Sequence, residues 1–521
     1  MKNNSRYIAR ILIEAATPLA IGSGEKGLTT DRLVARDMNG LPYIPGTSLA
    51  GVTRHELIAA GVDDQVVNSL FGYDESSGRQ GQGSRIIFSP GLMIAENGSD
   101  VIEGLSVLPD NSPYYSRFMK LPERDHVKIS GYGAAVKHGK YDEEVVFKGT
   151  RFCFEMELEG NPQDADAWAM ILEILHRPYT RLGAGSRKGF GKFTIISCKE
   201  QHFDLTKHGE IMAYLNKSAS LNSDVSNWRN TELSNKSETG SWIRYKIGLQ
   251  PESFFLFGSG TEGMDTDTGP KTESYISWKN EKPEFRDEIF LVPASSLKGA
   301  LAHRVAFHYN QLTKNYIEDS GTISIGSEIT PGKEKILEKF SSSMNTGHKE
   351  SDPRSQDWDK WEEELQNLDL GEWLENDTGW NTFTNELEKL KKTQKQGGHP
   401  NNAVDALFGH LGEDNQTGSR GNVIISDIYL ENYGEETKIF DHLSIDRFTG
   451  GGINGALYNE KVLYTEKYTV DILVNEKAFS DENIRKAFEN TLDDLVNGLL
   501  QLGGNVNRGH GSFRGKYEII K

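Results

Sequence analysis

The 521-residue sequence contains only two cysteines, Cys153 and Cys198, so it cannot form a network of disulfide bonds. It has no apolar run long enough to cross a bilayer, and the N-terminal residues lead into no apolar signal core. We therefore expect a reducing, cytoplasmic location and no membrane partner. An excess of positive charge is also missing, because the formal net charge is −18. Taken alone, this charge argues against a nucleic-acid-binding protein, although local basic clusters remain.

What the sequence does contain is an internal repeat of three blocks. The first block joins a glycine loop to a proline-bracketed turn and a helix, at 21–51 and again at 256–299. The second is Leu-Phe-Gly followed by a polar loop and a β-rich stretch, and it begins at Leu70 and at Leu407. The third is a glycine-rich loop with interleaved cations, at 182–193 and 502–517.

Three blocks in the same order are unlikely to arise by chance, so they predict two homologous domains. We place the first at 1–216 and the second at 241–521, with a Ser- and Asn-rich linker at 217–240. The order of expected elements in each domain is strand, helix, strand, strand, helix, strand. This order predicts an α+β protein built from two tandem ferredoxin-like domains, a fold that does not by itself decide function.

The second domain also has a large insertion, at about 312–402, without a counterpart in the first. It is acidic and carries four tryptophans, at positions 358, 361, 373 and 380. Two interpretations stay open. The insertion is either a solvated decoration or a docking surface in which the tryptophans anchor another protein.

The two glycine-rich loops are candidate phosphate-binding sites, because glycine lets the backbone approach a phosphate and nearby cations neutralise it. Neither loop has the spacing of a Walker loop, and each precedes a strand rather than a helix. A polynucleotide backbone is the better ligand, and a tight turn with solvent-facing cations is the alternative. The candidate RNA-binding residues here are Arg187, Lys188, Arg508 and Arg514.

Two further groups of residues have RNA-binding chemistry. The helices after the proline turns offer hydroxyls and cations at their starts, which suit a phosphate, although serines there are often ordinary N-caps. The mid-domain excursions at 124–141 and 442–451 mix cations with aromatic residues, which suits single-stranded RNA or a plain surface hairpin. The candidates are Ser48, Arg54, Ser296, Lys298 and Arg304 on the helices, and His126, Lys128, Lys137 and Arg447 on the excursions.

Asp31 is the most informative carboxylate, since it lies in a loop beside Arg32 between two glycine turns. It could hold a hydrated Mg²⁺ or orient a 2′-hydroxyl near a scissile phosphate. A loop aspartate also commonly caps local backbone N–H groups. The spacing of acidic residues offers no second metal ligand.

Taken together, the blocks resemble the RAMP superfamily, and more narrowly the backbone subunits of type III CRISPR effector complexes. The resemblance rests on Ile21–Gly24, Asp31 with Arg36-Asp37, and Tyr43–Gly51 in the first domain. In the second it rests on Leu407–Gly409, Ile445–Arg447 and the terminal glycine loop. The fused arrangement resembles the single-chain backbone proteins of type III-D-like systems.

The resemblance implies RNA-recognition-like cores with protruding thumb hairpins that bind guide RNA and position complementary target RNA beside other effector subunits. It implies that Asp31 cleaves the target with Mg²⁺ or another divalent cation. The same spacing in the second domain lands on Glu281, while the longer loop there also offers Asp265 and Asp267. The alternatives are a non-catalytic structural subunit and an endonuclease that processes precursor guide RNA, with His126 or His55 as its base.

Overall fold

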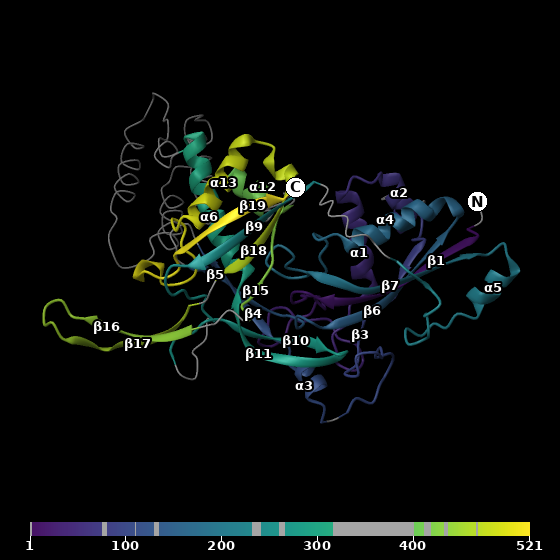
Figure 1. Ribbon diagram of the computed structural model, residues 1–521, viewed down its shortest axis with the longest axis horizontal. Helices are drawn as coiled ribbons and strands as arrows, with labels where there is room; N and C mark the ends of the chain where they lie inside the picture. The colour runs from purple at the N-terminus through teal and green to yellow at the C-terminus, as the bar shows by residue number, and fades with distance from the viewer. Residues whose placement is uncertain are drawn as a thin grey trace, which may run out of the picture.

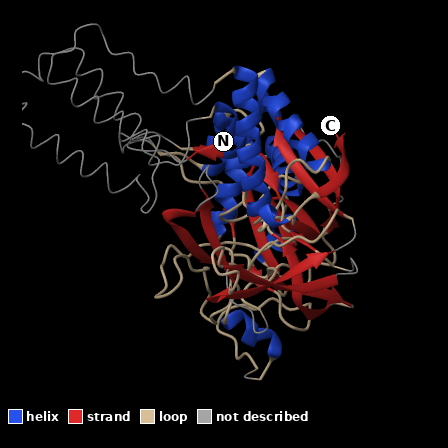
Figure 2. Cartoon of the chain, turned by 90° about the vertical axis from the view of Figure 1, so that its left-hand side faces the viewer, coloured by secondary structure: helices blue, strands red, loops and turns tan. Residues whose placement is uncertain are grey.

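The computed structural model describes residues 3–74, 81–109, 111–129, 135–231, 241–259, 266–315, 401–410, 418–431, 436–464 and 467–520. The expected insertion falls almost entirely outside these residues, as do its four tryptophans. The described residues form two α+β units with the same strand order and separate cores. Figure 2 shows most of the helices gathered on one side of the strands.

The first unit is built around a sheet in the order β2-β6-β1-β7-β8, in which every pair is antiparallel. The central strand is fully buried at Ile8, Ile11 and Ile13, which explains its place between two neighbours. The elements are β1 (Ser5–Ala15), α1 (Gly46–Ala59), α2 (Asp64–Phe71), β2 (Ile86–Phe88), β3 (Leu92–Met93), α3 (Pro113–Met119), β4 (Glu123–Ile129), β5 (Ala135–Glu144), β6 (Arg151–Gly160), α4 (Ala165–His176), β7 (Phe193–Asp204), α5 (His208–Leu215) and β8 (Arg229–Asn230).

The second unit repeats this topology in the sheet β14-β18-β9-β19. In both units the first strand lies between the third and the fourth, which is the ferredoxin-like order, so the α+β prediction of two repeated domains is confirmed. The elements are β9 (Trp242–Pro251), β10 (Thr272–Lys279), β11 (Lys282–Val292), α6 (Ala294–Thr313), α12 (Asn402–Phe408), β12 (Gly409–His410), β13 (Ser419–Arg420), β14 (Val423–Ile425), β15 (Ile428–Tyr429), β16 (Glu436–Ile445), β17 (Gly452–Tyr464), β18 (Tyr468–Asn475), α13 (Glu482–Val496) and β19 (Phe513–Ile520).

The proline-bracketed turns start the first helix of each unit. Helix α1 begins directly after Pro45 and helix α6 directly after Pro293. Each helix thus begins two residues before the serine, Ser48 or Ser296, at which the sequence predicted its start. Each proline is the N-cap of its helix, with an extended ψ of 136° or 130°, and it lacks an N–H that the helix start would leave unpaired. Ser48 and Ser296 therefore lie in the first helical turn and are not N-caps.

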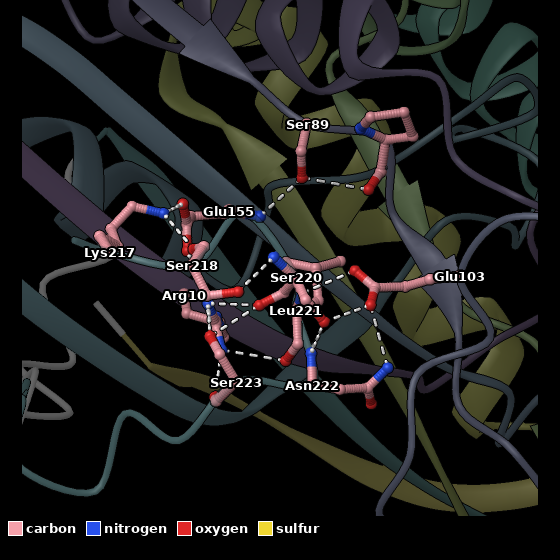
Figure 3. Close-up of polar contacts among 11 residues, drawn as sticks. Arg10, Ser89, Glu103, Glu155, Lys217, Ser218, Ser220, Leu221, Asn222 and Ser223 are labelled. Carbon is pink, nitrogen blue, oxygen red and sulfur yellow. Dashed lines mark hydrogen bonds and ion pairs between the residues drawn. The ribbon is translucent and has the colours of Figure 1, made fainter. Parts of the chain in front are cut away.

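The segment expected to be a linker belongs largely to the first unit. Arg10 of β1 donates from Nη1 to the carbonyl oxygens of Leu221 and Ser223, at 3.0 and 2.7 Å, as Figure 3 shows. Lys217 pairs with Glu155 of β6 at 2.5 Å, and β8 extends the sheet. The first unit thus continues to position 231. The sequence did not indicate this, because the groups that bind the buried Arg10 are backbone carbonyls, which every residue type has. Residues 232–240 lie outside the described part.

Two β-hairpins occupy the positions of the basic, aromatic excursions. The first hairpin is β4–β5 and the second hairpin is β16–β17. Each stands as a separate two-stranded sheet and shares no ladder with the main sheets. Figure 1 shows the second hairpin reaching far out from the body of the protein.

The units are joined by a strand pair of the second unit, β10–β11, that packs on the first. Ile276 and Phe285 lie in the core of the first unit, where Phe285 meets Phe147 at a ring-centroid distance of 5.1 Å. Trp278 donates from Nε1 to the carbonyl oxygen of Gly149 at 2.7 Å. Gly149 must be glycine, because a Cβ there would lie 1.9 Å from the carbonyl oxygen of Ile276.

A buried ionic cluster completes this junction. Arg124, at the base of the first hairpin, contacts Glu273 of β10 at 2.5 and 2.7 Å and Asp427 at 3.0 Å. The three side chains are at most 5 % exposed. Asp427 also accepts a 2.8 Å bond from the backbone N–H of Ala294, so the cluster ties the first hairpin to the start of α6.

Candidate nucleic-acid interface

Asp31 lies in the first acid loop, residues 30–34, which runs alongside strand β5 of the first hairpin. Its backbone N–H donates to Asp142 Oδ1 at 2.7 Å, and the N–H of Asp142 donates to Asp31 Oδ2 at 3.2 Å. Glu144 continues the pairing with a 2.9 Å bond to the carbonyl oxygen of Arg32. The hairpin therefore fixes the backbone of the loop while the Asp31 side chain stays exposed.

The second unit builds the same arrangement with Asp267. Its N–H donates to Asn459 Oδ1 at 2.8 Å, and the N–H of Asn459 donates to Asp267 Oδ2 at 2.8 Å. Lys461 then bonds to the carbonyl oxygen of Thr268 at 2.8 Å. Asp267, in the second acid loop (266–269), is thus the structural counterpart of Asp31, and Asn459 is the counterpart of Asp142.

Glu281, another acidic candidate of the second unit, lies elsewhere. Glu281 is in the turn between β10 and β11, at φ 63°, against Gly98 of the first unit. A Cβ at Gly98 would lie 1.6 Å from the carbonyl oxygen of Glu281, so the turn is tightly docked. The spacing of Asp31 from Arg36 predicted Glu281 as its counterpart. That prediction did not allow for the β10–β11 strand pair, which the second unit has at this point and the first unit does not. Asp265 is outside the described residues.

The acid loops could bind a metal ion together with RNA, but they do not supply a full set of protein ligands. Asp31 and Asp142 bring two carboxylates to one place, whereas Asp267 is beside an amide. Within the described ranges, no group of three or more His, Cys, Asp or Glu residues could hold a metal. Mg²⁺ commonly takes one or two carboxylates and completes its shell with waters and substrate phosphates. These residues therefore fit a cation that RNA would help to bind.

A cation cluster lies at the seam between the units, and we call it the seam cluster. The glycine loop of the first unit packs on the second, since Arg187 Nε donates to the carbonyl oxygen of Gly421 at 2.7 Å. Arg187 Nη1 is buried and has no hydrogen-bond partner. Arg420 is 3.4 Å from Glu56, the acid that lies among these cations. The seam cluster consists of Arg181, Arg187, Lys188, Lys298 and Arg420.

Burial and neighbouring cations lower the pKa values of several groups in and beside the seam cluster. Burial, together with Lys188 and Arg187, lowers the pKa of Lys298 to about 8. Burial and Arg420 likewise lower the pKa of His55 and of Arg187. Cations that repel each other in a partly desolvated place are stabilised by an anion, and a phosphate supplies both the charge and the acceptors for Arg187 Nη1.

Three cations expected to bind RNA are instead paired within the protein. Arg54 joins α1 to α2 through Asn68 Oδ1 at 2.8 Å and the carbonyl oxygen of Gly72 at 3.1 Å. Arg304 pairs with Asp494 of α13 at 2.5 Å, and Arg514 pairs with Glu252 at 2.5 Å. Sequence alone could not reveal these partners, because the two acids come from distant segments and the partners of Arg54 are an amide and a backbone carbonyl on another helix.

The remaining candidates lie on the hairpins, the helix starts and the second glycine loop. Lys128 is exposed on the first hairpin, Arg447 is exposed at the tip of the second, and Arg508 lies over the Tyr458 ring at 5.1 Å. Lys137 is in β5, and its side chain is outside the described part. Ser48 is half-buried in α1, and Ser296 is exposed on α6.

His126 is poorly placed to act as a base on RNA. Its side chain is 9 % exposed, stacks on Tyr141 and lies 2.9 Å from Glu143. A general base must reach the proton that it removes. This geometry counts against the precursor-processing alternative at His126, whereas His55 is exposed on α1.

The structure adds residues that the sequence did not single out. Asp142, Asn459 and Arg420 become visible only when distant segments meet, although Arg420 was part of a repeated block. Phe448 is fully exposed, at 100 %, beside Arg447. The sequence signal that could have singled out Phe448 is an aromatic residue next to an arginine in a glycine-flanked turn, a combination that suits nucleic-acid binding.

Comparison with protein families identifies the family to which the chain belongs. One family, RAMPs, described as the RAMP superfamily, matches residues 12–194 and 252–514, most of both units. The chain belongs to the RAMP superfamily. Each matched segment lies within one of the two structural units, so this is a tandem RAMP protein. A search of curated proteins found no match.

RAMP membership gives the coarse function, which is that of a CRISPR-associated RNA-binding subunit. The seam cluster, the exposed hairpin residues and the acid loops lie within the two matched segments. Among the helices that the structure describes, none is long and apolar enough to cross a membrane.

Proposed function

We propose that this tandem RAMP protein is a guide-RNA-binding backbone subunit of a type III CRISPR interference complex that positions and cleaves complementary target RNA. The observation that carries the proposal is the repeated pairing of an exposed loop aspartate with the base of a hairpin, Asp31 with Asp142 and Asp267 with Asn459. One chain would thus present two equivalent cleavage positions along one guide–target duplex. The alternative is a backbone subunit without cleavage activity.

The binding part of the proposal rests on the seam cluster. Its cations come from both units, so a backbone phosphate placed there would be held by the first glycine loop and by α6 at once. Electrostatic contacts of this kind bind RNA without reading its sequence, as a guide carrier requires. The net charge of −18 does not oppose this function, because the cations are concentrated at one place.

The cleavage part assigns Asp31 and Asp267 to the scissile phosphates, next to nucleotides that the hairpins, acting as thumbs, displace. A divalent cation bound by the aspartate and the RNA would neutralise charge that develops on the phosphate. The protein holds the aspartate backbone through the reciprocal bonds to the hairpin, which keeps the carboxylate in place before the RNA arrives.

The first test is to purify the complex and extract its nucleic acid. Bound RNA of uniform length with a shared repeat-derived segment is the expected result. If no RNA co-purifies and the protein has no affinity for repeat-containing RNA, the proposal is wrong. Cleavage of a complementary RNA, measured with and without Mg²⁺, then separates the catalytic subunit from the structural one.

Guide binding should depend on the charge of Lys298. Because the pKa of this lysine is about 8, its charge is present at pH 7 and lost as the pH rises towards 9, so RNA affinity should fall over this range. We expect Lys298→Ala to weaken binding about tenfold at pH 7 and Lys298→Arg to remove most of the pH dependence. Fluorescence anisotropy with labelled guide RNA measures both. Lys207→Ala, at the exposed residue just before α5, is the matched control, and an equal loss there would contradict the role of the seam cluster.

Phe448 should act on the guide–target duplex and not on the guide alone. A fully exposed aromatic ring at the tip of a projecting hairpin can stack on a displaced base, which is worth about 1–3 kcal/mol. Phe448→Ala should therefore reduce the fluorescence change of a 2-aminopurine placed at the displaced target position. Leu499→Ala, which removes another exposed apolar side chain of the second unit, should leave this signal unchanged. An unaltered signal in Phe448→Ala would exclude the contact.

A further inference from the structure

Both hairpins carry a buried glutamate at the base of their second strand. The Glu143 side chain is 2 % exposed, with Oε1 2.9 Å from His126 Nε2 and Oε2 3.9 Å from Arg32 Nη1. The Glu460 side chain is 1 % exposed, with Oε1 2.7 Å from His442 Nε2 and 3.4 Å from His510 Nε2. Each glutamate joins the first strand of its hairpin to another element of the same unit.

Each of these histidines also stacks on a tyrosine of the opposite strand. His126 stacks on Tyr141 with ring centroids 4.9 Å apart, and His442 stacks on Tyr458 at the same distance. A cation of the glycine loop covers each tyrosine, Lys188 at 4.6 Å and Arg508 at 5.1 Å. The two tyrosine rings are therefore occupied within the protein. The arrangement is a brace that links both hairpin strands to the glycine loop.

The brace lies directly behind the acid loops. Residue 142, which bonds to Asp31, immediately precedes Glu143, and residue 459, which bonds to Asp267, immediately precedes Glu460. Successive side chains of a strand point to opposite faces. One residue therefore holds the acid loop on one face, and the next anchors the strand to the histidine on the other.

A buried carboxylate favours one arrangement strongly, since it is costly without its partners. The Glu143 carboxylate lies 2.9 Å from His126 and 3.9 Å from Arg32, so moving the strand would leave this buried group without these partners. The same brace occurs in both units, although the glycine-loop residues differ. This repetition indicates that the brace serves the feature that both units have, the acid loop held by a hairpin strand.

We propose that Glu143 and Glu460 are positioning residues, each of which sets the place of its own acid loop through the hairpin strand. The proposal rests on the proposed function for its catalytic consequence, but the positioning itself can be measured without RNA. Glu143→Gln keeps the shape of the side chain and removes the charge. It should loosen the first acid loop and leave the second as it is, and Glu460→Gln should do the reverse.

Amide hydrogen exchange of the whole protein tests the positioning. In Glu143→Gln, protection of the amides of Asp31 and Asp142 should fall at least tenfold, whereas those of Asp267 and Asn459 should not change. Glu200→Gln is the matched control, because Glu200 is also buried and paired, with Arg229 and Trp168, but lies on β7. Unchanged protection at Asp31 in Glu143→Gln, or equal loss in both units, overturns the proposal.

Cleavage gives the second readout, with the two cuts in one target RNA as internal controls. Glu143→Gln should slow the cut assigned to Asp31 about 10- to 100-fold in single turnover, with the other cut and the RNA affinity retained. His126→Gln should have the same effect, and the double variant should be no slower, because both changes remove one contact. Additive effects, or both cuts slowed alike, would indicate general destabilisation and overturn the proposal. If the wild-type protein does not cleave, the cleavage function fails separately, and hydrogen exchange still decides the positioning.

Discussion

Asp31→Asn should abolish one of two cuts in a complementary target RNA, and Asp267→Asn should abolish the other. Asparagine retains a side-chain oxygen that can accept the bond from the hairpin N–H, just as the amide oxygen of Asn459 accepts a bond from the loop N–H of Asp267 in the second unit. The substitution therefore removes charge and metal affinity while it keeps the loop in place. Loss of a group that acts on the transition state costs on the order of 10²–10⁴-fold in rate. Single-turnover cleavage of an end-labelled target measures both cuts in one lane.

The control for this prediction is Glu25→Ala, which removes an exposed acid near the first acid loop and should change neither cut by more than about twofold. A double variant, Asp31→Asn with Asp267→Asn, should bind guide and target normally and cut neither position. If the cleavage pattern of the single variants equals that of the wild type, the aspartates are not catalytic. The cuts would then come from other residues of the chain or from a partner subunit. Loss of a cut in Glu281→Gln and not in Asp267→Asn would instead favour the assignment made by chain spacing.

Arg124→Met should destabilise the protein by about 3–5 kcal/mol, because it leaves Glu273 and Asp427 buried without their cation. The side-chain volume is similar, so the lost charge dominates over a cavity. Burial raises the pKa of Asp427 already in the presence of Arg124, which shows how unfavourable this carboxylate is there. Urea and thermal unfolding measure the loss.

Arg117→Met is the matched control at the same junction. Arg117 pairs with Asp287 of β11, but the two side chains are 37 % and 47 % exposed. Solvent screens such a pair, so the expected loss is within about 1 kcal/mol. Equal destabilisation by the two variants would mean that the buried cluster has no special role. Because Arg124 is at the base of the first hairpin, we also expect Arg124→Met to weaken target positioning in the first unit more than in the second.

The repeat in the sequence was sufficient to predict two α+β units of one topology. Strand and helix patterns depend on neighbours in the chain, so the sequence predicts the first strand at 7–16, the third strand at 151–158 and the second helix at 165–176, close to the observed β1, β6 and α4. The boundary after residue 216 could not be predicted, since residues 217–231 are largely polar and Arg10 holds them through backbone carbonyls. The sequence of the β10–β11 pair also gives no indication that this strand pair packs on the first unit.

The sequence by itself determined the duplication, the proline-initiated helices, the glycine loops and Asp31 as a candidate site, because each is encoded within a few neighbouring residues. Only the tertiary structure decided that Asp267 is the counterpart of Asp31, and that Asp142 and Asn459 hold the two loops. It also decided which cations gather in the seam cluster and which pair with partners elsewhere in the protein. The physical reason is that charge pairing and reciprocal hydrogen bonds act across space, between residues more than a hundred positions apart, where chain spacing carries no information.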